Sequence, residues 1–220
     1  YPTPALTPHL FPFVLGAEQS FDPPFVRINR PSESTMKILG SSELIEEPEL
    51  KKINDFLQQQ DWACKGPVRL LYHQDPFFGG RLYTSFQNLP TRRQDIRKRT
   101  LINGQPICEV DFSANQLRMQ LALFFAKDAG EDPYGEIALN SDGLEKEKVK
   151  QFIVVAFGAK SRHKAIGGCW KKGINHKEFK ALELATLETY PELKLFDAWT
   201  HQAQNLEGQI LKKIMLQGVE

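Results

Sequence analysis

The sequence has few cysteines. Cys64, Cys108 and Cys169 are scattered over 220 residues and include no C-x-x-C pair, which excludes a disulfide framework and a paired-cysteine metal site. We therefore expect free thiols and a cytoplasmic protein.

Several other features are missing. No apolar run approaches the roughly 20 residues of a membrane span, and no signal peptide is visible, so we expect no membrane partner. The histidines have no H-x-x-x-H or H-x-H spacing, which argues against a zinc site. Neither G-x-x-x-x-G-K-[ST] nor G-x-S-x-G occurs, which argues against a P-loop and a hydrolase elbow.

The net charge is also small. The chain carries 28 Lys and Arg against 27 Asp and Glu, so its overall charge of +1 identifies no partner. Its composition is that of an ordinary globular protein, and its length suffices for one large domain or two small ones.

Proline spacing and hydrophobic periodicity divide the chain into segments. Residues 1–33 hold half of the prolines and predict an extended Pro/Phe-rich arm, which could contact a protein partner. Residues 41–60 have a helical pattern, and residues 68–73 read as a strand. Residues 145–157 and 174–190 predict two further helices, and residues 192–220 predict one long helix or two.

A hairpin and a helix are predicted around residues 100–125. Asn103-Gly104 between two apolar runs is a strong hairpin signal, and it places Asp111 near the end of the second strand. Ser113 with Gln116 three residues later is a capping-box pattern that begins a helix.

Asp111 is the first candidate functional residue. A carboxylate at the end of a strand is a suitable ligand for a hard cation such as Mg²⁺. The alternative is that Asp111 only helps to begin the following helix, and spacing alone leaves both open.

Positive charge is concentrated in two blocks. The segment "TRRQDIRKR" is rich in arginine, and residues 145–180 carry ten Lys and Arg against three Glu, a local net charge of +7. Such blocks favour a polyanion, a nucleic acid or nucleotide phosphates, although solvated charged faces are common. The candidate nucleic-acid contacts are Arg92, Arg93, Arg97, Arg99, Lys160 and Arg162.

The helix expected over residues 145–157 could bind a nucleotide. Lys146, Lys148 and Lys150 lie at its beginning and could present cations to a triphosphate. Phe157 at its far end could present a ring to a base.

Taken in order, six segments between residues 79 and 220 resemble the palm and fingers of the family A DNA polymerases, the DNA polymerase I type. "GGRLYTSFQNLPTR" is similar to G-R-L-S-S followed by N-L-Q-N-I-P-x-R, and "VDFSANQLRM" is similar to motif A, D-Y-S-Q-I-E-L-R. "EDPYGEIA" resembles G-x-D-[IP]-[HY]-x-x-x-A, and "EKEKVKQFIVVAFGA" resembles the fingers helix. "TYPELKLF" and "NLEGQILKKIML" resemble the Y-P-x-[VL] and N-x-x-M-Q-G stretches.

This resemblance implies an α+β fold. A small antiparallel palm-like sheet with packed helices would carry Asp111, next to a mostly helical fingers-like subdomain. Residues 79–129 would be palm-like, residues 130–190 fingers-like, and residues 191–220 a helix returning toward the palm. Residues 34–78 would be a reduced thumb-like segment or a unique one.

The resemblance also implies a template-directed DNA polymerase that uses two Mg²⁺ ions to transfer a nucleotide from a dNTP to a primer 3′-OH. Asp111 and the Phe112 backbone would hold the ions, with Ser113 and Gln116 beside the nucleotide. Phe157 would stack on it, and Gly158 would leave room for the template base. Contacts to the DNA primer–template would come from Arg81, Gln87 and Arg92, and Arg118 would be a buried support of the palm.

The chain departs from the family pattern in three ways. The family lysine of the fingers helix falls on Val149, between Lys148 and Lys150, and Gln116 stands where a Glu is usual. The His-Asp motif that carries the second metal-binding aspartate does not occur. We therefore expect the chain to continue past Glu220, with the present segment inactive alone, as part of a compact polymerase of the kind found in phages and mobile elements.

Two alternatives stay open. One is a polymerase-like protein that binds nucleic acid without catalysis, and the other is a partner-binding domain. The sequence does not distinguish a DNA template from an RNA template.

Overall fold

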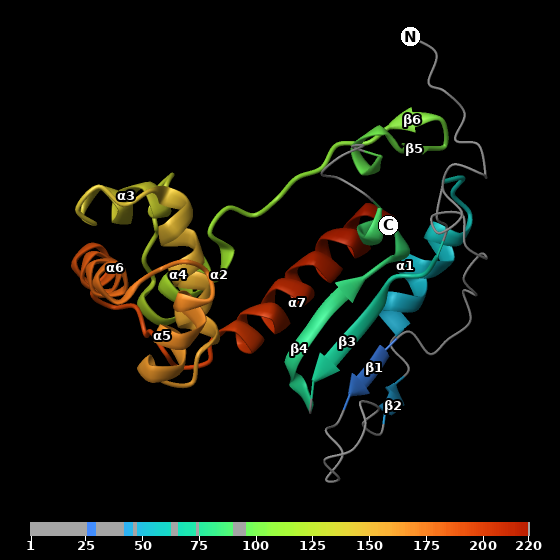
Figure 1. Ribbon diagram of the computed structural model, residues 1–220. Coiled ribbons are helices and arrows are strands. Elements are labelled where there is room, and N and C mark those ends of the chain that lie inside the picture. The colour runs from blue at the N-terminus through green and yellow to red at the C-terminus, as the bar shows by residue number, and fades with distance from the viewer. Residues whose placement is uncertain are drawn as a thin grey trace. The chain divides into compact units, whose positions relative to one another are not determined.

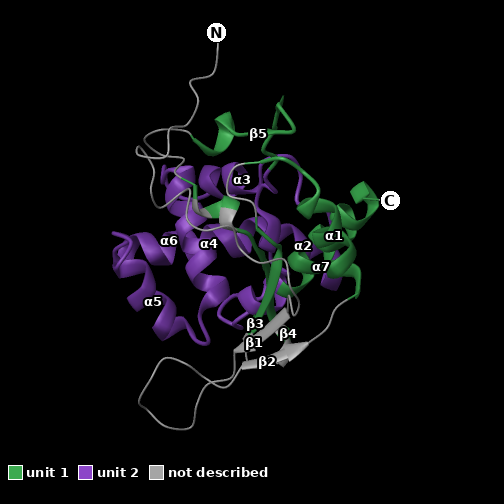
Figure 2. Ribbon diagram, turned by 90° about the vertical axis from the view of Figure 1, so that its right-hand side faces the viewer, with its two compact units in different colours: residues 1–110, 205–220 green, residues 111–204 purple. Residues whose placement is uncertain are grey.

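The computed structural model describes residues 26–29, 42–45, 48–62, 66–73, 75–89 and 96–219 (Figure 1). These residues form an α+β fold, as the sequence predicts. The chain divides into two compact units (Figure 2). Unit 1 comprises residues 1–110 and 205–220, and unit 2 comprises residues 111–204. Apart from the backbone of residues 26–29, the expected arm of residues 1–33 lies outside the described residues.

Unit 1 contains a four-stranded sheet in the order β2-β1-β3-β4. The strands are β1 (Val26–Asn29), β2 (Ser42–Ile45), β3 (Arg69–His73) and β4 (Asp75–Tyr83). The pairs β1–β2 and β3–β4 are antiparallel, whereas β1 runs parallel to β3, so this sheet is mixed. The strand expected over residues 68–73 is confirmed as β3.

Helix α1 (Pro48–Gln58) forms the core of unit 1 with the sheet. Its buried Leu50 and Ile53 pack against the apolar side chains of Val68, Leu70 and Leu82, as the helical spacing predicts. Buried Asn54 fixes this packing, because its side chain donates to the Val68 carbonyl at 3.0 Å and accepts from the Val68 N–H at 2.8 Å. These two bonds satisfy backbone groups that burial would otherwise leave unpaired.

Helix α7 (Thr200–Val219) crosses the boundary between the units, and from residue 205 onward it belongs to unit 1. There it lies along β4 (Figure 1). Gly208 faces the backbone of Gly80 so closely that an added Cβ would lie 2.0 Å from the Gly80 carbonyl oxygen. Only a residue without a side chain allows this approach, so Gly208 sets how closely the helix packs on the strand.

The predicted hairpin is present, but it is shorter than expected. Strands β5 (Leu101–Ile102) and β6 (Gln105–Pro106) flank Asn103 and Gly104, which have φ values of 51° and 75°. Positive φ at both positions is the geometry that Asn-Gly favours. Pro106 ends the ladder, and residues 107–112 form no strand. The expectation that Asp111 lies at the end of a sheet strand is therefore wrong.

Unit 2 is helical. It contains α2 (Asn115–Phe125), α3 (Pro133–Leu139), α4 (Lys146–Gly158), α5 (Arg162–Trp170) and α6 (His176–Thr189). Helices α4 and α6 confirm two predictions, whereas α3 and α5 were not expected. The core face of α4 has regular spacing of three and four residues and comprises Val149, Phe152, Ile153, Ala156 and Phe157. None of the described helices is long and apolar enough to cross a membrane.

The beginning of α2 differs from the prediction. Its N-cap is Ala114, which has a left-handed φ of 51° and provides no side-chain cap. The capping box expected from Ser113 and Gln116 is therefore wrong. The Gln116 side chain instead accepts a hydrogen bond from the Thr200 hydroxyl at 3.2 Å.

Candidate nucleotide and nucleic-acid interface

The segment that contains Asp111 is an exposed turn before α2. Asp111, Phe112 and Ser113 are all exposed. Half-buried Arg118 holds this turn, because its Nε donates to the Ser113 carbonyl at 2.9 Å. Its Nη2 donates to the Glu131 carbonyl, also at 2.9 Å. Arg118 thus ties the turn to the loop before α3. Its side chain is half-buried, whereas the resemblance implies a buried support of the palm.

Gln116 also fixes the position of α2. Besides the bond to Thr200, its backbone carbonyl accepts from the Trp199 indole N–H at 3.0 Å. The side chain is half-buried and committed to this contact. In the present arrangement Gln116 therefore holds α2 against the segment that leads into α7.

The residues around Asp111 do not fit two magnesium ions. Nowhere in the described part of the chain do three or more His, Cys, Asp or Glu side chains group as a metal site would require. Asp111 supplies one exposed carboxylate, whereas two bridged cations need several oxygen ligands.

Two of the three lysines proposed to bind a triphosphate are engaged in ion pairs. Lys146 contacts the Asp132 carboxylate at 2.7 Å and holds the pKa of that carboxyl below its ordinary value, with the Gly135 N–H as the next cause. Lys148 forms an ion pair with Glu178. Lys150 is exposed and forms no ion pair with a described residue.

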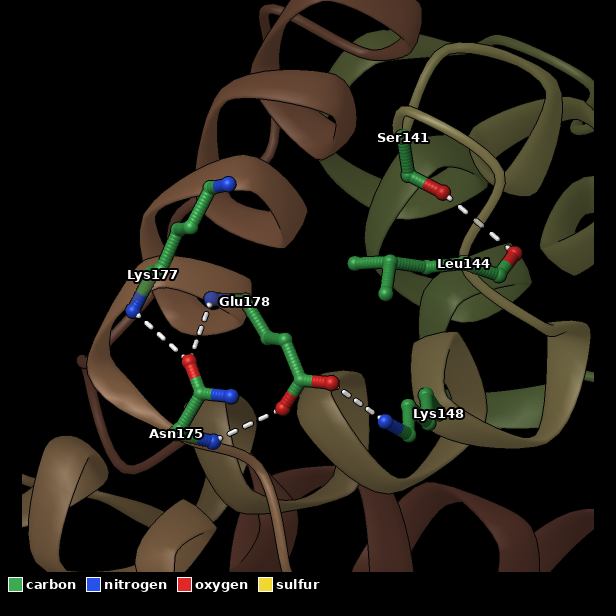
Figure 3. Close-up of polar contacts among 6 residues, drawn as sticks. All are labelled: Ser141, Leu144, Lys148, Asn175, Lys177 and Glu178. Carbon is green, nitrogen blue, oxygen red and sulfur yellow. Dashed lines mark hydrogen bonds and ion pairs between the residues drawn. The ribbon is translucent and has the colours of Figure 1, made fainter.

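The Lys148–Glu178 pair belongs to the capping box of α6 (Figure 3). One Glu178 oxygen accepts from the Asn175 backbone N–H at 2.8 Å, and the Asn175 side chain accepts from the Glu178 N–H at 3.0 Å. The other Glu178 oxygen faces Lys148. Lys148 therefore connects α4 to the start of α6, and its hydrogen bond is the main cause that lowers the pKa of Glu178.

The proposed stacking role of Phe157 is wrong for this arrangement. Phe157 is fully buried on the core face of α4, because it continues the apolar stripe of that helix. Its ring is therefore not available to a nucleotide base. The adjacent Gly158 is exposed, and an added Cβ would lie 3.6 Å from the Thr200 hydroxyl, in ordinary contact.

Arg162 is likewise engaged inside unit 2. Its guanidinium forms a two-pronged contact with Glu183 at 2.7 and 2.6 Å, and it lies 5.2 Å from the centre of the Phe179 ring. The hydrogen bond to Glu183 raises the pKa of Arg162. Lys160, just before α5, is exposed.

The remaining predicted nucleic-acid contacts belong to unit 1. Arg81 is exposed on β4, and the Gln87 side chain, in the short helix η1 (Ser85–Asn88), donates to the Leu82 carbonyl at 3.1 Å. In η2 (Arg97–Arg99), Arg97 pairs with Glu109, whereas Arg99 is exposed. Arg92 and Arg93 lie outside the described residues.

Sequence reasoning missed a cluster at the end of α5. Trp170 is 67% exposed and is followed by Lys171 and Lys172, both exposed. The run "WKKG" was the available signal, but it was counted only as part of the basic block.

Comparisons with protein-family models, curated proteins and solved structures gave no match for this chain.

Proposed function

We propose that this chain is the palm and fingers portion of a template-directed DNA polymerase, which binds a primer–template and a nucleoside triphosphate. The observation that carries the proposal is the pair of Arg118 hydrogen bonds. They join the motif-A-like turn, at Ser113, to the segment that resembles G-x-D-[IP]-[HY], at Glu131. Two resembling segments are thus held together by the arginine of the motif itself.

Two other resembling segments support the proposal within unit 2. Tyr190, of the Y-P stretch, places its hydroxyl 2.9 Å from the Ala129 carbonyl and 2.6 Å from the Glu136 carboxylate. The same stretch contacts the end of the fingers-like helix, where Phe196 N–H donates to the Ala156 carbonyl at 2.9 Å. The four segments therefore form one packed body and can act on one ligand.

The described residues account for binding and positioning. Asp111 would contribute one carboxylate toward a divalent cation, and Lys150, Lys160 and Arg81 are exposed cations available to phosphate. Nucleotidyl transfer with two metal ions requires several oxygen ligands, and the described residues contain no group of three or more His, Cys, Asp or Glu side chains that could hold a metal ion. In this proposal these residues serve the recognition of the primer–template and the nucleotide.

The test combines binding with primer extension. Fluorescence anisotropy of a labelled primer–template, with and without Mg²⁺ and a complementary dNTP, measures recognition, and gel analysis measures incorporation. Asp111→Asn should remove the Mg²⁺-dependent tightening by the dNTP while leaving primer–template affinity within about twofold. Glu188→Gln is the matched control, because it removes the same charge from an exposed position on α6. Equal behaviour of the two variants would overturn the metal role of Asp111.

A second function is favoured by a specific observation: Asp111 is exposed, and the described residues contain no group of three or more potential metal ligands. A polymerase-like protein that binds nucleic acid without catalysis would need no second metal ligand. It would bind the primer–template with strong salt dependence and show no response to Mg²⁺ and dNTP. The anisotropy experiment separates the two functions, since only the first predicts a complex that tightens with the correct dNTP.

A further inference from the structure

The basic residues of the block at 145–180 differ in whether an acidic side chain neutralises them. Lys146, Lys148 and Arg162 are neutralised by Asp132, Glu178 and Glu183. A second group is exposed, and none of its members forms an ion pair with a described residue. It consists of Lys164, Lys171, Lys172, Lys177 and Lys180, all on α5, on α6 or in the turn between them.

An exposed aromatic ring belongs to the same stretch of chain as this second group. Trp170 is the last residue of α5 and is 67% exposed, an unusual state for so large an apolar side chain. Lys171 and Lys172 follow it directly. An aromatic face among unpaired cations is the combination with which proteins hold single-stranded nucleic acid, by stacking a base and contacting neighbouring phosphates.

The backbone around Trp170 is fixed. Cys169 and Ile174, on either side of the turn, are buried, and the Ile174 N–H donates to the Cys169 carbonyl at 3.0 Å. The Gly173 N–H donates to the Trp170 carbonyl at 3.0 Å, and Gly173 has a φ of +79°, which suits glycine at the end of a helix. The ring is thus presented from a turn that is anchored at both ends.

We infer that the α5–α6 turn is a binding surface for single-stranded nucleic acid. Trp170 stacks on one base, and Lys171, Lys172 and Lys177 contact the adjacent phosphates. Residues 170–175 of the turn contain one exposed large apolar side chain, Trp170, whereas a lipid surface would require several to insert together. The inference deepens the nucleic-acid part of the proposed function and holds for the catalytic and the non-catalytic version alike.

The first test measures binding of labelled oligo(dT) to the chain by anisotropy. Trp170→Ala should weaken binding about fivefold or more, as expected for loss of one stacked base, while Trp170→Phe should retain most of the affinity. Leu139→Ala, at a position that is 87% exposed on α3, is the control for removing an exposed apolar side chain. Quenching of tryptophan fluorescence by the oligonucleotide should be present in the wild type and strongly reduced in Trp170→Phe.

The second test measures the charge contribution. The Lys171→Gln/Lys172→Gln double variant should lower the slope of log affinity against log salt by about 1.4 for a single strand. The control is Lys52→Gln/Lys213→Gln, which removes the same charge from exposed positions in unit 1.

The outcomes separate this inference from the proposed function. If wild type binds the primer–template but the Trp170 and lysine variants bind oligo(dT) like wild type, the surface is wrong and the proposed function stands. If wild type binds no nucleic acid, both are overturned. Binding of anionic vesicles through Trp170, without affinity for oligo(dT), would overturn the nucleic-acid assignment of the turn.

Discussion

The two units are stabilised in different ways. Unit 1 has a small core between α1 and the sheet, and apolar side chains of α7 pack against it. Helix α7 also approaches β4 closely through the backbones of two glycines. Unit 2 has an all-helical core with fully buried aromatic rings and is further connected by ion pairs and by Arg118. The charged residues of unit 2 therefore differ in their surroundings. Those facing other helices hold the unit together, and those in the α5–α6 turn are free for a ligand.

The largest expected effect concerns the core of unit 2. Phe157→Ala should lower the free energy of unfolding by about 4 kcal/mol, because it removes a fully buried ring from between packed helices. Urea denaturation followed by circular dichroism measures the change. The exposed Leu139→Ala should stay within about 0.5 kcal/mol of wild type. A Phe157→Ala protein as stable as wild type would show that the ring is not a core residue.

The second effect tests the glycine contact of unit 1. Gly208→Ala should destabilise by about 3 kcal/mol, since the new methyl group would meet the Gly80 carbonyl and force α7 away from β4. Gly218→Ala on the same helix, where an added Cβ meets nothing within 4 Å, should instead stabilise by about 0.5 kcal/mol. Chemical denaturation of both variants provides the measurement. The same sign for both changes would contradict the close packing of α7 on the sheet.

The third effect tests Arg118. Arg118→Met should cost about 2 kcal/mol, because two hydrogen bonds from a charged donor to backbone carbonyls are lost. Hydrogen–deuterium exchange should show faster exchange over residues 113–118 and 128–136. Arg99→Met removes an exposed cation from unit 1 and should change neither quantity. Unchanged hydrogen–deuterium exchange in the Arg118 variant would contradict the inference that Arg118 links the two loops.

The smallest effect is the pH dependence of the α6 capping box. Lys148 holds the pKa of Glu178 below its ordinary value of 4.5. Ionised Glu178 therefore stabilises the folded protein above pH 4.5, and this stabilisation is lost as the pH falls through the lowered pKa. Between about pH 5 and about pH 3, wild type should lose more stability than Glu178→Gln. The control variant Glu188→Gln should lose stability over this pH range as wild type does. An equal loss of stability in wild type and Glu178→Gln would contradict the coupling of Glu178 to Lys148.

Local patterns in the sequence predicted much of the fold. The Asn103-Gly104 turn, the helices at 146–158 and 176–189, and strand β3 follow from turn chemistry and periodicity. Helix α5 was not predicted, because Gly167 and Gly168 lower helix propensity at its centre. Its stability comes from packing, since Gly168 lies so close to Val155 of α4 that an added Cβ would meet that side chain at 2.7 Å.

The candidate site was less predictable than the fold. Periodicity places Phe157 on the apolar face of α4, which is the buried face, whereas the resemblance assigns its ring to a nucleotide. A count of charges cannot separate Lys148, which pairs with a glutamate 30 positions away, from Lys171, which pairs with no described residue. Such pairings depend on tertiary structure, and they decided which cations remain available.

The backbone of Ala114 has a consequence for the direction of the turn that precedes it. Alanine with a φ of 51° is strained by about 1 kcal/mol relative to glycine, and its methyl group is buried at this position. Ala114→Gly would relieve that strain but would also let residues 111–113 sample many more orientations. The strained backbone of Ala114 therefore restricts the conformations open to residues 111–113, at a cost in stability.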